Sequence, residues 1–472
     1  MAGIGFRIER MLSSGNVNSK VSGAIAAIFV SAGPWIATII SIAFISFVTP
    51  ASEDPVAQFT ARAIINYSFA GSLLIFSLFE LPLTRYISDL IFIKQEPSLP
   101  SVLSSISVLL LGICFIIGFL IFSLCGLPVE HVVLATSLLC IVTLIWTAMI
   151  FLSATKDFNY ISTSFIIGTI ISCGSAFLMS MFKIGSYGFL FGFTLGQGIL
   201  LVLLMSRIFS EFKWGLSYPH FFWSFLKKQK ILICTGLAYA LGVWCDKFIN
   251  WFFGPNSQQI NGGFFMSGPY DTSLFLAYLF VIPSLAFFVV KSETSFYLTY
   301  REYIINIEVK ASYDQIEKSR ENMMKSISRI MRQLAAFQLI FTGAGLVFST
   351  EILELLKLDA SHNAIFRFGI VGATFHVFFL FTNITLLYLA EYRFVLTSYL
   401  FFLATNSGFT LLNQYFHPEA LGIGYAFSTL LTLCLSLCFL RYVLDDFDYF
   451  MFSKQPFALT RANQLEEGQF KL

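Results

Sequence analysis

Apolar stretches of about 20 residues recur along the whole chain, and this feature restricts its fold more than any other. A stretch of that length crosses the hydrocarbon core of a bilayer as a helix. Only 12% of the 472 residues are charged, and the mean hydropathy is +0.77. The sequence therefore predicts an all-α polytopic membrane protein. Its twelve expected spans lie at residues 21–48, 63–83, 102–124, 132–154, 161–182, 187–209, 231–253, 272–290, 333–350, 364–389, 394–416 and 421–444.

Composition excludes several other classes of protein. The formal net charge of +2 gives no reason to expect a nucleic-acid partner. All eight cysteines lie in apolar stretches and form neither a CxxC motif nor a Cys/His metal spacing, so we assign them no chemistry. The first apolar run, 21–48, is too long for the core of a signal peptide and is expected to remain as a span.

The distribution of Lys and Arg predicts how the chain is oriented. Cytoplasmic loops of membrane proteins are enriched in these residues. If the N-terminus lies in the cytoplasm, all but five of the 29 Lys and Arg residues fall on the cytoplasmic side. Both termini are therefore expected to be cytoplasmic. The five exceptions are Arg62, Lys183, Lys247, Lys357 and Arg367.

Two long inner connections organise the chain. One of them separates two sets of six spans, and a faint repeat relates these sets: Gly188 and Arg207 recur as Gly422 and Arg441 at an offset of 234 residues. We therefore expect two pseudo-symmetric six-helix lobes, a common plan in transporters. The expected segments are a cytoplasmic leader 1–20, an N-lobe 21–209, a cytoplasmic inter-lobe linker 210–230, a C-lobe 231–444 and a cytoplasmic tail 445–472.

The second inner connection, residues 295–332, carries charged and aromatic residues at helical spacing. Such a pattern is typical of an amphipathic helix, here on the inner face of the membrane or as an extension of the ninth span. It could dock a cytoplasmic partner or serve as a solvated connector.

Asp246 and Lys247 are adjacent inside the seventh span. Ionisable groups within a membrane usually face a protein interior or a wet cavity. Lys247 lies close enough to the outer end to extend its side chain to the interface, and neighbouring helix residues point about 100° apart, so a simple pair is not expected. Asp246 is the candidate to face a cavity, where it could bind a cationic sugar or exchange H⁺ or Na⁺. Alternatively, it is the structural partner of Arg367 or Arg62.

A second group of candidates lines the expected pathway or closes it. Aromatic residues could stack on sugar rings or simply pack, namely Trp35, Tyr67, Tyr239, Trp244 and Tyr278. Near the inner end of the second span, Arg85 and Asp89 are four residues apart and follow Glu80, so these three could form an inner gate or an ordinary helix-end salt bridge. Pro283 and Gly33-Pro34-Trp35 should bend the eighth and first spans.

The remaining motifs indicate little chemistry. His376, inside the tenth span, could relay protons or pack as a hydrogen-bonded side chain. Asp446 and Asp448 have the DxD spacing of metal-dependent glycosyltransferases, but the surrounding sequence lacks a nucleotide-binding pattern. We expect no catalytic residues and no metal site, and therefore not an enzyme.

Three motifs resemble those of the PelG family, the membrane transporters of the Pel exopolysaccharide system within the MOP flippase superfamily. They are residues 1–10 (MAGIGFRIER), Gly33-Pro34-Trp35 and residues 84–89 (TRYISD). The resemblance implies two lobes about a central cavity and export of a partly deacetylated amino-sugar polymer by alternating access, with rocking about spans one, two, seven and eight. It also implies a bacterial inner membrane, a cytoplasmic glycosyltransferase and further Pel-type inner-membrane proteins as partners.

Other functions stay open at this point. The runner-up is a flippase for a lipid-linked oligosaccharide, whose pyrophosphate would need the few cations Arg62, Lys247 and Arg367, or a cation-coupled drug exporter. A membrane-embedded glycosyltransferase is the alternative from another class.

Overall fold

The computed structural model describes residues 55–453, with gaps at 93–97, 156–157, 183–184, 213–219, 262, 417 and 419–420, together with Gly23, Ala27, Ile28 and Gly33. The described chain is almost entirely helical. A helix satisfies its backbone N–H and C=O groups within one segment, as a chain surrounded by hydrocarbon requires.

The first lobe contains five long helices in its described part. Its core is built from aliphatic and aromatic side chains such as Ile64, Leu103, Ile145 and Phe193, all fully or almost fully buried. The helices are α3 (Pro55–Phe92), α4 (Leu99–Leu124), α5 (Val129–Thr155), α6 (Phe158–Met181) and α7 (Gly185–Glu211).

The linker between the lobes contains a short helix, α8 (His220–Lys228), that lies against the first lobe. Its Phe222 is fully buried, with its ring 5.2 Å from that of Tyr86 on α3. The linker is therefore packed onto the N-lobe in this part rather than forming a free tether.

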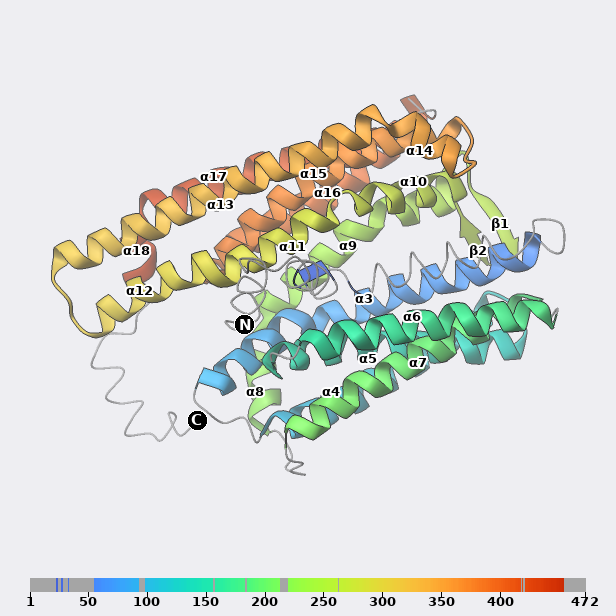
Figure 1. The fold of residues 1–472 in the computed structure, drawn as a ribbon, viewed down its shortest axis with the longest axis horizontal. Helices are drawn as coiled ribbons and strands as arrows, with labels where there is room; N and C mark the ends of the chain where they lie inside the picture. Colours follow the sequence, from blue (N-terminus) through green and yellow to red (C-terminus); the bar gives the residue numbers. More distant parts are fainter. Residues whose placement is uncertain are drawn as a thin grey trace.

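The second lobe has its own core, which includes Leu334, Ile365, Phe379 and Phe402. Its long helices are α9 (Lys230–Phe253), α13 (Tyr313–Val347), α15 (Ser361–Tyr388), α16 (Tyr392–Phe416) and α17 (Ile423–Asp445), and its shorter ones are α10 (Gly268–Leu279), α11 (Ile282–Lys291), the π-helix η2 (Ser292–Phe296), α12 (Tyr297–Glu308), α14 (Ser349–Leu355) and α18 (Phe447–Phe452). In Figure 1 the two bundles lie on opposite sides of the molecule, with α3 and α9 between them. The structure thus confirms an all-α fold with two lobes.

Helix α9 is the element that joins the lobes. On one side it meets α3, where a Cβ atom on Gly236 would lie only 2.1 Å from the backbone oxygen of Ser77. On the other side it meets α16, whose Asn406 amide donates a hydrogen bond of 2.9 Å to the Gly242 oxygen. Only a glycine permits the first approach, because any larger side chain would separate the two helices.

The expected eighth span is broken, as Pro283 predicts. Helix α10 ends at Leu279, α11 begins at Ile282 with this proline in its first turn, and the two parts bend by 42°. Proline cannot donate the backbone hydrogen bond that would continue the first helix. The predicted bend is confirmed here, whereas residues 34 and 35 of the first span lie outside the described residues.

Most of the 295–332 connection forms two antiparallel helices. Helix α12 continues from η2, and the chain turns at Lys310, which has a φ of 54°. Helix α13 then begins after Ser312, whose backbone N–H is capped by the Gln315 side chain at 3.2 Å, and continues through the ninth expected span as one helix of 35 residues.

Among the described residues, ten helices are long and apolar enough to cross a membrane, and α10 with α11–α12 makes an eleventh if the bent pair is one span. The first expected span, 21–48, lies outside the described residues except for Gly23, Ala27, Ile28 and Gly33. The count of twelve therefore stays a prediction.

One short hairpin of strands interrupts the helices. Strand β1 (Gln258–Asn261) pairs with β2 (Phe264–Met266) in antiparallel register between α9 and α10. The hairpin lies at the end of the molecule opposite to the α12–α13 turn (Figure 1).

Candidate functional site

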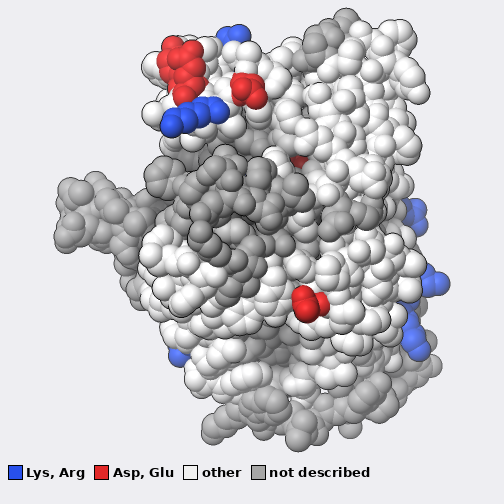
Figure 2. Space-filling view, turned by 90° about the vertical axis from the view of Figure 1, so that its right-hand side faces the viewer, with Lys and Arg blue, Asp and Glu red and all other residues white. Residues whose placement is uncertain are grey.

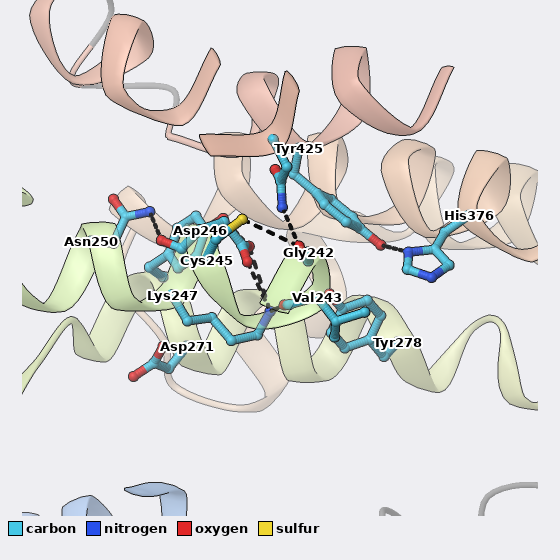
Figure 3. Close-up of polar contacts among 12 residues, drawn as sticks. Gly242, Val243, Cys245, Asp246, Lys247, Asn250, Asp271, Tyr278, His376 and Tyr425 are labelled. Carbon is cyan, nitrogen blue, oxygen red and sulfur yellow. Dashed lines mark hydrogen bonds and ion pairs between the residues drawn. The ribbon is translucent and has the colours of Figure 1, made fainter. Parts of the chain in front are cut away.

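A buried ion pair lies on α9, the helix that joins the lobes. Asp246 is completely inaccessible to solvent and Lys247 is 2% exposed. The Lys247 ammonium lies 3.3 Å from the nearer Asp246 carboxylate oxygen and donates a hydrogen bond of 3.0 Å to the Val243 backbone oxygen. Figure 3 shows the Lys247 side chain turning back along α9 to reach these partners.

Two sequence-based expectations about this pair are wrong. Lys247 does not extend to the outer interface, and the two neighbours do pair. Their Cα–Cβ bonds diverge, but the four-carbon stem of Lys247 is long enough to bring its ammonium back over one helical turn. A charge in hydrocarbon is stabilised by a partner, and the nearest carboxylate is one residue away.

Tyrosine hydroxyls complete the environment of the pair. The Tyr270 hydroxyl on α10 donates a hydrogen bond of 2.6 Å to Asp246, and the Tyr278 hydroxyl accepts one of 3.4 Å from Lys247. The ammonium also lies over the rings of Trp244 and Tyr278, 5.5 and 5.4 Å from their centroids. Cation–π contacts of this kind add to the stabilisation of a desolvated cation.

A second buried carboxylate lies beside the pair. The Asp271 side chain, 3% exposed, accepts hydrogen bonds of 2.8 and 2.9 Å from the Trp251 indole N–H. The sequence analysis did not identify Asp271, Tyr270 or Trp251. An acidic residue that begins an apolar span is a signal that could have found Asp271.

A small cavity of about 50 Å³ adjoins this cluster on the side of His376. One ring nitrogen of His376 lies 2.9 Å from the Tyr425 hydroxyl, and the other lies 3.1 Å from the Tyr239 hydroxyl. Tyr278 also lines the cavity. The walls are mostly aliphatic, and three tyrosines and His376 supply the polar groups, so the space has room for a few water molecules.

The other predicted pathway residues are distributed around this cluster. Tyr67 on α3 stacks on Trp251 at 4.5 Å between ring centroids, so it belongs to the contact between the lobes. Arg367 is exposed on α15 and donates to the Leu346 backbone oxygen at 3.5 Å, so the alternative in which it pairs with Asp246 is wrong. Trp35 lies outside the described residues.

The predicted inner-gate residues separate into two groups. Arg85 and Asp89 form an exposed ion pair with an N–O distance of 3.9 Å near the C-terminal end of α3. The Arg85 guanidinium also lies over the ring of Tyr392 at 5.4 Å, which links α3 to α16 of the other lobe. Glu80 lies further inside α3, away from this ion pair, and is half-buried.

The arrangement favours a conformational role over direct polymer binding. Asp246 and Lys247 are enclosed by α9 and α10 and are almost completely inaccessible, so a polymer cannot contact them in this conformation. The three cations that a pyrophosphate site would need do not converge, because Lys247 is paired with Asp246 and Arg367 points elsewhere. Among the described residues, no group of three or more His, Cys, Asp or Glu side chains is placed to hold a metal ion.

Comparison with known proteins identifies the family of the chain. The family model for PelG, described as "Putative exopolysaccharide Exporter (EPS-E)", matches residues 1–452. No curated protein matches the chain by sequence.

Several solved transporters share the fold. A MATE crystal structure in complex with MaD3S superposes with a TM-score of 0.64 at 13% identity, covering 90% of this chain and 96% of the other. An outward-facing MATE transporter of the MOP superfamily gives 0.61 at 13% identity, covering 94% and 98%. An inward-facing one gives 0.56 at 13% identity, with the same coverage of 94% and 98%.

Proposed function

The chain belongs to the PelG family of exopolysaccharide exporters, and from this membership we propose that it moves a Pel-like amino-sugar polymer across the bacterial inner membrane by alternating access between its two lobes. The fold that it shares with outward- and inward-facing MATE transporters supports this mode of transport. Substrate enters between the lobes from the cytoplasm, where a glycosyltransferase and other Pel-type membrane proteins supply it.

The proposed orientation places both termini in the cytoplasm. The Lys and Arg residues of the described chain concentrate at the end with α8 and the α12–α13 turn, as in cytoplasmic loops. On the opposite end, which carries the β1–β2 hairpin, the charged side chains that face the viewer in Figure 2 are mostly Asp and Glu. We therefore assign the hairpin end to the periplasm.

The buried Asp246–Lys247 pair is the observation that carries the proposed mechanism. It lies on α9, the helix that contacts both lobes, and it is sealed from a polymer by its neighbours. Of the two coupling ions considered, a proton fits better than Na⁺. The Lys247 ammonium already occupies the position where a metal cation would neutralise the carboxylate, whereas a proton on Asp246 would release Lys247.

Release of Lys247 would then alter the contacts between α9 and α10. The freed ammonium keeps the Val243 oxygen and the Tyr278 hydroxyl as acceptors, while a protonated Asp246 keeps Tyr270 as its partner. The ammonium therefore keeps hydrogen-bond acceptors but loses its counter-charge, which favours a shift of the two helices to another conformation in the transport cycle.

Secretion by a strain that lacks the chromosomal gene tests this proposal. Asp246→Asn should abolish extracellular amino-sugar polymer when secretion is expressed per amount of the protein present in the membrane, and cytoplasmic polymer synthesis should stay intact. Asp445→Asn is a matched control, because it removes the carboxylate of an exposed ion pair with Arg441 on α17. Normal secretion with Asp246→Asn would refute the role of the pair, and absence of polymer export by the native protein would refute the function itself.

A further inference from the structure

We propose that the β1–β2 hairpin, residues 258–266, is the outer gate of the exporter and must detach from the N-lobe before polymer can leave. This inference rests on the proposed function and its orientation. The hairpin belongs to the C-lobe by sequence, since it connects α9 to α10, yet its inner face is buried in the N-lobe.

Backbone hydrogen bonds fix the hairpin to two helices of the N-lobe. The Gly263 N–H donates to the Cys125 oxygen, just after α4, at 2.9 Å. The Tyr67 hydroxyl on α3 donates to the Phe265 oxygen at 3.0 Å. Each contact joins a segment of the C-lobe to one of the N-lobe, so both must break if the lobes part at this end.

Phe264 is the apolar anchor of the hairpin. It is 1% exposed and packs with N-lobe core residues. Its ring lies 6.1 Å from that of Phe122 in a stacked arrangement and 4.9 Å from that of Tyr67 edge to face. Met266 is also buried in this core, at 6% exposure. The hairpin therefore closes the space between the lobes with side chains as well as with backbone.

The hairpin has little stability of its own. Its strands have four and three residues, and the register shifts between Gln259 and Asn261. A two-stranded hairpin of this size is marginal in water unless it packs on something else. Its contact with the N-lobe is therefore what holds it in place, and loss of that contact frees it as a unit.

The buried ion pair and the hairpin are structurally connected. Trp251 stacks on Tyr67 of the N-lobe and donates to Asp271 at the start of α10. The Ser257 hydroxyl, next to β1, bonds to the backbone oxygen of Trp251. A shift of α9 relative to α10 at Asp246 would thus move both ends of the hairpin.

A disulfide between the hairpin and the N-lobe tests the gate directly. A Cβ atom on Gly263 would lie 3.6 Å from the Cβ of native Cys125, within the range that disulfides adopt. Gly263→Cys should therefore cross-link to Cys125 under oxidising conditions. We expect export to fall in proportion to the cross-linked fraction and to return after reduction.

Two controls isolate the effect of the tether. Gly263→Ser has nearly the same size but no thiol, and Gly263→Cys with Cys125→Ser cannot form the bond; both should export under oxidation as they do under reduction. Full cross-linking with unchanged export would overturn the gate, because the hairpin would then remain on the N-lobe throughout the cycle. Failure to cross-link in folded protein would overturn the contact itself.

A second variant keeps the inference testable if Gly263→Cys does not fold. Phe264→Ala removes the anchor, so a membrane-impermeant maleimide should label Cys125 on the order of tenfold faster in a chain whose other cysteines are replaced by serine. An unchanged labelling rate would count against a hairpin held by Phe264. Cross-linking and labelling are measured without the polymer, and export by the native protein is measured separately, so a failure of the gate is distinguishable from a failure of the proposed function.

Discussion

Neutralising either member of the Asp246–Lys247 pair should destabilise the protein strongly, whereas neutralising both should not. Asp246→Asn leaves the Lys247 ammonium buried with only neutral partners, the Val243 oxygen and the Tyr278 hydroxyl. Lys247→Met leaves the carboxylate with the Tyr270 hydroxyl. The double variant replaces both charges with uncharged side chains of similar shape, so no ion is left unpaired.

The expected size follows from the geometry. At the observed 3.3 Å separation, two unit charges attract by about 5 kcal/mol at an effective dielectric constant of about 20. Breaking one side of a buried pair typically costs about 3–5 kcal/mol, while replacing the whole pair is close to neutral. Unfolding entropy is about 2.1 cal/mol/K per residue, so 1 kcal/mol corresponds to about 1 °C for 472 residues, and each single variant should lower the melting temperature by roughly 3–5 °C.

Thermal unfolding of the purified protein in detergent, followed by intrinsic fluorescence, provides the measurement. We expect the double variant to regain most of what each single variant loses, with a coupling energy of about 2 kcal/mol or more. Additive losses, within about 0.5 kcal/mol, would show that the two charges do not stabilise each other and would refute the reasoning.

Three further predictions concern packing and hydrogen bonds, and the same unfolding assay checks each. Gly236→Ala should lower the free energy of unfolding by about 1–3 kcal/mol because its Cβ would collide with the backbone of α3. Gly343→Ala, which has open space around it, should be neutral or slightly stabilising. Equal effects of the two variants would contradict the contact between α9 and α3. Tyr425→Phe should cost about 1–3 kcal/mol because His376 loses its 2.9 Å partner, and an unchanged midpoint would argue against that bond. Arg320→Ala should cost less than about 1 kcal/mol, since its carboxylate partners are largely accessible, and a larger loss would indicate a structural role for α18.

The positions of the long helices, the break in the eighth span and the division into two lobes are predictable from the sequence. Apolar stretches separated by polar connections locate the helices because hydrocarbon admits few other conformations, and Pro283 locates a break because it cannot donate a backbone hydrogen bond. The two lobes follow from the position of the linker and from the PelG resemblance, and the family match confirms that resemblance. The expected orientation and the domain boundaries stay predictions.

The contacts of the candidate site are much less predictable. Position along α9 places Lys247 near the interface, but burial by α10 and α16 decides where its flexible side chain turns. The sequence gives no sign that Asp271, Tyr270 and Trp251 belong to the same site. Each is ordinary for its own segment, and they come into contact only when α9 and α10 pack together. The β1–β2 hairpin was missed for a similar reason, since seven residues of ordinary composition do not reveal that they pack in the opposite lobe.

The length of α13 has a practical consequence. A helix of 35 residues is about 52 Å long, whereas the hydrocarbon core is about 30 Å thick, so roughly 20 Å of α13 stands clear of the membrane together with α12. Small membrane proteins without a soluble domain are difficult to align in electron micrographs, because the surrounding micelle hides their features. An antibody epitope or fusion partner inserted at the 309–312 turn would give this exporter a rigid fiducial, at a distance from both the ion pair and the hairpin.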